Sequence, residues 1–156
     1  MIYELKDFLE VRKKLKEQNK KLVFTNGCFD ILHRGHIEYL QQAKSLGDYL
    51  IVGLNSDSSV KKIKDESRPV NNENDRAYVL NGLNVIDAVV IFSEDTPYNL
   101  INEIVPDFLV KGGDWTEDKI VGSDIVKKSG GKVISLKYVD NYSTTSTINK
   151  LRKLGN

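Results

Sequence analysis

The chain has 156 residues, 40% of them apolar and 29% charged, which is long enough for one core and too short to suggest two. Lys and Arg number 23 against 22 Asp and Glu, a formal net charge of +1, so no global field recruits nucleic acid or a membrane surface. The lone Cys28 excludes a disulfide framework and a multi-thiolate zinc site, and without a signal peptide or an apolar span of about 18 residues we expect one cytoplasmic domain, residues 1–156.

The first part of the chain alternates helical and strand patterns. Its predicted elements are helix 3–19, strand 21–25, helix 37–46 and strand 48–57. The first helix has one apolar stripe and lysines elsewhere, so residues 1–20 are expected to cover the sheet. Gly47 can end the second helix. The nearly continuous apolar run that follows is typical of a strand covered on both faces of a parallel sheet.

The alternation continues to the end of the chain. The remaining predicted elements are helix 73–83, strand 88–92, helix 97–104, strand 108–111, a strand within 129–136 and a final helix within 141–155. Strands that alternate with helices predict an α/β fold with a single doubly wound parallel sheet. The polar, lysine-rich segment Ser56–Val70, closed by a proline, is expected to be a mobile loop.

The segment Phe24–His36, "FTNGCFDILHRGH", carries the first candidate site. In a doubly wound sheet, ligands bind outside the carboxyl ends of the strands, where helix N-termini point at them. Asn26 and Gly27 allow a sharp turn and a close approach of backbone to ligand. His33 and His36 share one face, so both imidazoles can meet one polyphosphate. The alternative is a core histidine and a helix-start histidine, but Gly35 and the upstream turn favour a site.

Two further groups of residues suit an anion. Ser143, Thr144, Thr145 and Thr147 crowd the start of the last helix, and ordinary N-capping explains only one of them. The loop lysines Lys61, Lys62 and Lys64 form either a solvated charge run or a group that closes over bound phosphates.

Three more candidates follow turns or begin helices. Arg76 makes either a surface ion pair with Asp75 or Glu73, or a phosphate contact. In "VKGGDW", Gly112 lets backbone approach a base or sugar, and Asp114 accepts from hydroxyls or holds a metal through water; the alternative is a plain turn with a solvated aspartate. Cys28, beside the first turn, is expected to contact ligand through its backbone.

Two motifs carry a family resemblance. "GCFDILHRGH" resembles the G-x-F-D-x-x-H-x-G-H signature of the cytidylyltransferase-like nucleotidyltransferases, and "YSTTSTI" is similar to their S-T-T-x-x-I signature. The segments "GDYLIVGLNSD", "ESRPVN" and "EDTPYNLINEIVPDFLVKGGDW" most resemble the adenylyltransferase family that acts on D-glycero-β-D-manno-heptose 1-phosphate. That family often occurs fused to a sugar kinase, and this chain resembles its stand-alone form.

The resemblance implies a Rossmann-like nucleotidyltransferase fold and transfer of AMP from ATP to a sugar 1-phosphate, giving pyrophosphate and ADP-heptose for surface-glycan assembly. It implies that His33 and His36 stabilise charge at the α-phosphorus, with Lys64 and Arg76 as a positive clamp. Mg²⁺ is expected as the companion of ATP, with no metal ligand from the protein, and a homodimer is expected. The residues assigned to the nucleotide are Asn26, Gly27, Cys28, Phe29, Gly35, Arg76, Gly112, Asp114, Ser143, Thr144 and Thr145; those assigned to the acceptor substrate are Asp30, Lys61 and Lys111.

Alternatives remain in substrate and in class. Another enzyme of this fold would act on glycerol 3-phosphate with CTP, or on a different phosphomonoester with ATP. The segment "YVDNY" lacks the arginine that the glycerol-phosphate cytidylyltransferases have there, which argues against CTP. A nucleotide-binding regulatory module without turnover is the third alternative, and the histidines, lysines and hydroxyls together argue against it. Arg34, between the histidines, adds a charge with no assigned effect.

Overall fold

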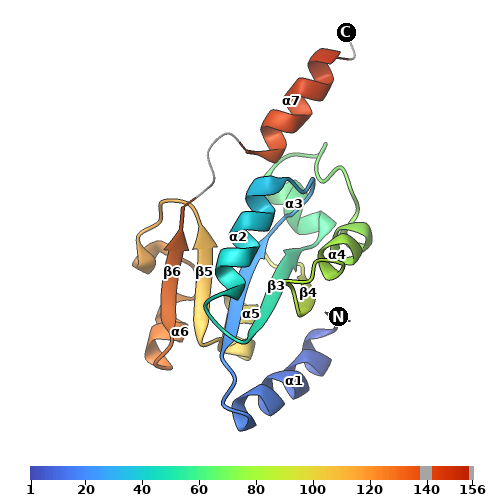
Figure 1. Cartoon of the computed structure of the whole chain (residues 1–156). Helices are drawn as coiled ribbons and strands as arrows, with labels where there is room; N and C mark the ends of the chain where they lie inside the picture. Colours follow the sequence, from blue (N-terminus) through green and yellow to red (C-terminus); the bar gives the residue numbers. More distant parts are fainter. Residues whose placement is uncertain (138–141, 155–156) are drawn as a thin grey trace.

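Short apolar segments form the parallel strands of one sheet in the computed structural model, which describes residues 1–137 and 142–154. The strands are β1 (Ile2–Tyr3), β2 (Leu22–Gly27), β3 (Tyr49–Asn55), β4 (Ala88–Phe92), β5 (Phe108–Gly112) and β6 (Lys132–Leu136). The helices are α1 (Leu5–Glu17), α2 (Arg34–Lys44), α3 (Asp57–Ile63), α4 (Glu73–Asn81), α5 (Tyr98–Ile104), α6 (Ser123–Lys128) and α7 (Thr144–Leu154), with a 3₁₀ turn at Glu117–Lys119. Figure 1 shows the sheet between its helices, with α7 extending away from it.

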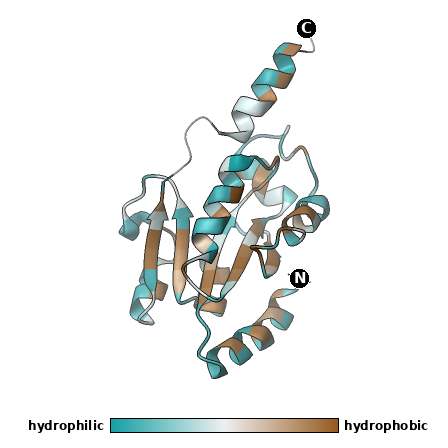
Figure 2. Cartoon of the chain, viewed as in Figure 1, coloured by the Kyte–Doolittle hydropathy of each residue, from teal (hydrophilic) through white to brown (hydrophobic). Residues whose placement is uncertain are grey.

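Both faces of the sheet are covered because successive strand residues point to opposite sides. Phe24 of β2 packs in a core with α1, α5 and α6, whereas its neighbour Val23 packs in a second core with α2 and α4. Apolar residues therefore dominate the strands in Figure 2. The predicted doubly wound parallel sheet is confirmed.

Three segments differ from the sequence prediction. Ile2 and Tyr3 form an edge strand paired with Val89 and Val90 of β4, so the first helix begins at Leu5. Helix α3 occupies much of the segment that was predicted as a loop. Its start is capped by Ser56, whose hydroxyl accepts the N–H of Ser59, and Ser59 and Val60 are buried. Helix α6 was not predicted.

The strand order places a topological switch beside β2. The order is β1-β4-β3-β2-β5-β6, so the chain runs from β2 through β3 to β4 on one side and then crosses to β5 on the other. Ligands in open α/β sheets bind at the carboxyl ends of strands where this reversal occurs. The turn after β2 and the end of β5 are therefore where a site is expected. Among the described residues, no helix is both long and apolar enough to cross a membrane.

Candidate active site

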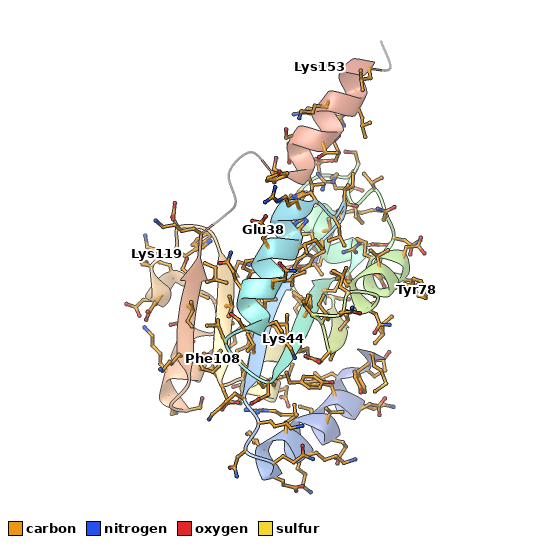
Figure 3. The ribbon with its side chains drawn as sticks, in the orientation of Figure 1. Glu38, Lys44, Tyr78, Phe108, Lys119 and Lys153 are labelled. Carbon is orange, nitrogen blue, oxygen red and sulfur yellow. The ribbon has the colours of Figure 1, made fainter. Side chains whose placement is uncertain are left out.

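A cavity of about 810 Å³ lies at the switch between β2 and β5. Its size is in the range of small-molecule sites. The parts of the chain that it brings together include the turn after β2 with the start of α2, the segment after α3, the end of β5 and the start of α7. In Figure 3, the label Glu38 marks α2, and the label Lys119 marks a wall residue in the 3₁₀ turn. The predicted residues on its wall are Asn26, Gly27, Cys28, Phe29, Asp30, His33, Gly35, His36, Lys64, Lys111, Gly112, Ser143, Thr144 and Thr145.

His33 and His36 form a stacked pair on this wall. Their ring centroids are 3.8 Å apart and their planes differ by 18°. Each Nδ1 is buried without a hydrogen-bond partner among the described residues, which leaves Nε2 as the nitrogen that a ligand can reach. Burial and the charge of His33 lower the pKa of His36 to about 4, and burial lowers the pKa of His33. Both rings are therefore neutral at pH 7 and each offers one N–H donor.

The local backbone explains how the pair is held. His33 is the extended residue before α2, and its carbonyl accepts the N–H of His36 at 2.9 Å. Phe29 has a positive φ of 41°, is buried, and places its ring 5.3 Å from that of His36. A Cβ at Gly27 would lie 2.9 Å from the Phe29 ring. Only glycine at this position lets the ring support His36 without a shift.

The start of α7 supplies hydroxyls and amide groups. The Ser143 hydroxyl caps the helix by accepting the N–H of Ser146 at 3.0 Å, and the Thr147 hydroxyl donates to the Ser143 carbonyl. Capping thus accounts for Ser143, and Thr147 is not part of the cavity wall. The Thr144 hydroxyl donates to the Ile31 carbonyl at 3.0 Å and so ties α7 to the loop that carries the histidines. First-turn N–H groups lack intrahelical partners and can bind an anion.

The end of β5 adds a half-buried cation. The Lys111 ammonium donates to Asn26 Oδ1 at 3.3 Å, across the switch. Burial lowers the pKa of Lys111, Cys28 opposes this, and the charge of Lys64 lowers the pKa further. Burial raises the pKa of the Cys28 thiol, which argues against a reactive thiolate. The charges of Lys64 and Lys111 therefore repel each other at the cavity wall and favour a bound anion beside them.

Arg76 was assigned to the nucleotide, but it is not part of the cavity wall, and its ion pair is with Asp57 rather than with the alternative partners Asp75 or Glu73. Its buried guanidinium donates to the Cys28 carbonyl at 2.6 Å, to the Asn71 carbonyl at 3.0 Å and to Asp57 at 2.8 Å. All three contacts are within the protein, so Arg76 braces the loops around the site. The sequence could not show this, because two of its partners are backbone carbonyls.

Two other predicted contact residues lie off the cavity wall, and the carboxylate of a third, the wall residue Asp30, is turned away from the cavity. The Asp30 carboxylate is only 1% exposed and accepts from Arg68 and from backbone N–H groups, so it does not face a substrate. Lys61 and Asp114 are exposed and are not part of the cavity wall. The Lys62 ammonium pairs with Asp95 at 3.0 Å.

Sequence reasoning missed several wall residues. Arg68 lines the cavity beside Lys64, and Asn55 and Asp95–Pro97 line it at the carboxyl ends of β3 and β4. The sequence could have indicated Asn55 and Asp95–Pro97, because ligands bind at the carboxyl ends of parallel strands and these residues lie at such ends just as Asn26 and Gly112 do. No group of three or more His, Cys, Asp or Glu residues that could hold a metal ion occurs within residues 1–137 and 142–154. The described side chains therefore do not form a protein-only metal site.

Comparison with known proteins agrees with the geometry. A family model described as "Cytidylyltransferase-like" matches residues 24–150. The chain is 53% identical over 151 residues to "Bifunctional protein HldE" of a Nitratiruptor species, covering 95% of this chain and 32% of that protein. It is 54% identical over 152 residues to the protein of the same name from Aliarcobacter butzleri, covering 96% and 31%. The chain thus spans about a third of the length of these relatives.

Solved structures show the same fold. The lipopolysaccharide core biosynthesis protein from Thermoplasma volcanium matches with a TM-score of 0.61 and 30% identity, over 80% of this chain and 99% of that one. Pantoate-beta-alanine ligase from Francisella tularensis matches with a TM-score of 0.60 and 18% identity, over 98% and 78%. The second likeness concerns the fold alone.

Proposed function

Because the chain belongs to the cytidylyltransferase-like family, we propose that it transfers AMP from ATP to D-glycero-β-D-manno-heptose 1-phosphate, giving ADP-heptose and pyrophosphate for surface-glycan biosynthesis. The observation that carries the proposal is the shared cavity of His33, His36 and the start of α7 at the sheet's switch point. The substrate is chosen from the segments that resemble the heptose 1-phosphate adenylyltransferase family, and the relatives named HldE, at 53% and 54% identity, are consistent with that choice.

The proposed reaction needs little from the protein beyond alignment and charge. An oxygen of the sugar phosphate attacks the α-phosphorus, a new P–O bond forms, and the bond to the bridging oxygen breaks so that pyrophosphate leaves. The nucleophile is already an anion, so neither a covalent intermediate nor a strong base is required. Donors that stabilise the extra negative charge of the transition state are sufficient.

The wall residues divide naturally between these tasks. The reachable nitrogens of His33 and His36 donate to the phosphates at the reacting centre. The hydroxyls of Ser143 and Thr145 and the free amide groups of the first turn of α7, including that of Thr144, hold the β- and γ-phosphates, and Gly112 lies close to the base or ribose. Lys64 and Lys111 lie on the wall nearer Cys28 and offset charge on the two approaching anions.

Three finer features belong to the proposal. Mg²⁺ would be held mainly by the nucleotide phosphates, as it commonly is when few carboxylates are offered, and no step above runs through it. ATP is a cytoplasmic metabolite, so the reaction is assigned to the cytoplasm. A homodimer is proposed from the family resemblance, and light scattering coupled to size exclusion tests it: a mass of one chain at micromolar concentration would contradict it.

A pyrophosphate-release assay tests the function. ATP and CTP are each combined with D-glycero-β-D-manno-heptose 1-phosphate and with glycerol 3-phosphate. We expect turnover with ATP and the heptose phosphate, at a kcat/KM at least about 100-fold above the other pairs, since a site built for one set of hydroxyls leaves polar groups unpaired with another. A preference for CTP and glycerol 3-phosphate would replace the assignment. No release with any pair would leave a binding module.

A further inference from the structure

We propose that Asp30 is a positioning residue: its buried carboxylate anchors the segment 68–71 and thereby holds Lys64 and Arg68 over the cavity. The role of Lys64 in this inference rests on the proposed function, whereas the anchor itself does not. Asp30 lies in the same turn as the histidines, but its side chain points into the protein rather than at a ligand.

The contacts of Asp30 all go to one segment. Oδ2 accepts from Arg68 Nε at 2.7 Å, and Oδ1 accepts from the N–H groups of Val70 at 2.8 Å and Asn71 at 3.0 Å. The Asn71 amide in turn donates to the Asp30 carbonyl at 2.9 Å. The side chains of Asp30 and Arg68 are only 1% and 11% exposed. Charge-assisted bonds shielded from water are the strong ones, so this anchor is stiff.

The carboxylate is ionised at neutral pH. Burial alone would raise the pKa of Asp30, but hydrogen bonds from the Asn71 and Val70 N–H groups and from Arg68 outweigh it and lower the pKa. A protonated Asp30 would lose the ion pair and present a donor to N–H groups. The ionised form is therefore the one that fits this segment.

A longer stretch, residues 57–71, contains this segment, and its first residue is held by other contacts. Arg76 pairs with Asp57 at the start of α3, and Glu73 accepts the Asp57 N–H at 2.6 Å. Lys64 directly follows α3 and lies four residues before Arg68. Both ends of the stretch 57–71 are thus tied to the protein, with Lys64 between them on the cavity wall.

This arrangement opposes a repulsion that would otherwise open the segment. Lys64, Arg68 and Lys111 all line the cavity, and the charge of Lys64 lowers the pKa of Lys111. The repulsion between Lys64 and Lys111 favours outward movement of the exposed stretch that carries Lys64. Asp30 neutralises Arg68 and keeps the stretch in place. Because this stretch is ordered before ATP binds, the binding energy of ATP is not spent on ordering it.

Limited trypsin digestion tests the anchor without reference to activity. Trypsin cuts after lysine, and Lys61, Lys62 and Lys64 lie within the anchored stretch. In Asp30→Asn we expect cleavage there to be about 10-fold faster or more, because losing a charged hydrogen bond changes local opening by about that factor or more. The matched control is Asp118→Asn, whose exposed carboxylate pairs with Lys127 and is not part of the cavity wall, and its cleavage rate at Lys61–Lys64 should equal that of the wild type.

Kinetics test the positioning role. With ATP and the heptose phosphate, Asp30→Asn should lower kcat by about 10-fold or more, and Asp30→Asn/Lys64→Ala should be no slower than Lys64→Ala alone. A residue that only stabilises the fold would give losses that multiply. If Asp30→Asn does not fold, Arg68→Met replaces it, since it leaves Asp30 its two backbone donors.

The cleavage and kinetic results test the anchor, the positioning of Lys64 and the proposed function separately. Wild-type cleavage rates at Lys61–Lys64 in a folded Asp30→Asn or Arg68→Met would overturn the anchor. Multiplicative kinetic losses would overturn the positioning of Lys64. An inactive wild-type chain would reject the proposed function and leave the cleavage comparison to decide the anchor.

Discussion

Truncating one histidine of the stacked pair should remove one hydrogen-bond donor from the reacting centre. Each ring has its Nδ1 buried and so presents a single reachable nitrogen. Loss of one preorganised donor to a developing oxyanion costs about 2.7–4 kcal/mol of barrier, about 100- to 1,000-fold in kcat. We expect this loss for His33→Ala and for His36→Ala, with a smaller change in KM for ATP because Ser143–Thr145 and Lys64 also hold the phosphates.

The double variant makes the prediction sharper. The ring centroids are 3.8 Å apart, so both donors are positioned to reach the same phosphate group and act as a unit. Residues that act as a unit give non-additive losses. His33→Ala/His36→Ala should therefore lose less than the product of the two measured single losses, a product expected between about 10⁴- and 10⁶-fold.

The assay is steady-state pyrophosphate release at saturating ATP and sugar phosphate, with circular dichroism to confirm folding. Arg34→Ala is the matched control, because Arg34 lies between the histidines but its exposed side chain pairs with Glu38 and is not part of the cavity wall. Its kcat should stay within about twofold, as expected for an exposed ion pair. Retention of more than a tenth of wild-type kcat in either folded histidine variant would refute the reasoning.

Three further predictions follow from named contacts. Arg76→Met should lower the free energy of unfolding by about 3 kcal/mol, because it strands two carbonyls and the Asp57 carboxylate; a urea-melt difference under about 1 kcal/mol would contradict it. Gly27→Ala should displace the Phe29 ring, which lies 2.9 Å from the added Cβ, and should lower kcat by a larger free-energy equivalent than it lowers the free energy of unfolding. An unchanged kcat would show that the Phe29 ring does not position His36. Folding lowers the pKa of His36 from 6.5 to about 4. Between these pH values the unfolded chain therefore binds more protons at His36 than the folded chain does. The contribution of His36 to the free energy of unfolding is highest above pH 6.5 and falls as the pH is lowered towards 4. His36→Asn should therefore lose less stability between pH 7 and 4.5 than the wild type, and equal losses in urea melts would count against it.

The parallel sheet was predictable because its signals are local. The strands β2, β3 and β4 each contain a run of at least three consecutive apolar residues and are each followed by a helical pattern, which is typical of a covered parallel sheet. The two-residue strand β1 is too short to show a period, and only its pairing with Val89 and Val90 makes it a strand. Helix α3 was missed because its lysines and the nearby proline outweighed a serine cap and two buried residues, Ser59 and Val60.

The site was predictable to the extent that strand ends and helix starts mark it. That rule located Asn26, His33, His36 and Gly112, all on the cavity wall. The assignments of Asp30, made from the family resemblance, and of Arg76, made from its place near a helix start, were wrong, because the sequence does not show whether a charged side chain near a turn points to the ligand or to backbone groups far along the chain. Arg76 contacts a carbonyl 48 residues away, a separation that no local pattern encodes.

The segment from Cys28 to His36 connects the residues that line the cavity with the charged residues that brace it. Its backbone accepts Arg76 at the Cys28 carbonyl and Thr144 at the Ile31 carbonyl, and its Asp30 side chain anchors the segment 68–71. Helix α4, the start of α7 and the stretch carrying Lys64 therefore dock on the same few residues that end in the histidine pair. The spacing of this loop is constrained by three docked segments as well as by chemistry. An inserted residue between Asp30 and His33 would change the position of the histidines relative to every other phosphate contact, so its cost to turnover should exceed that of losing either histidine alone.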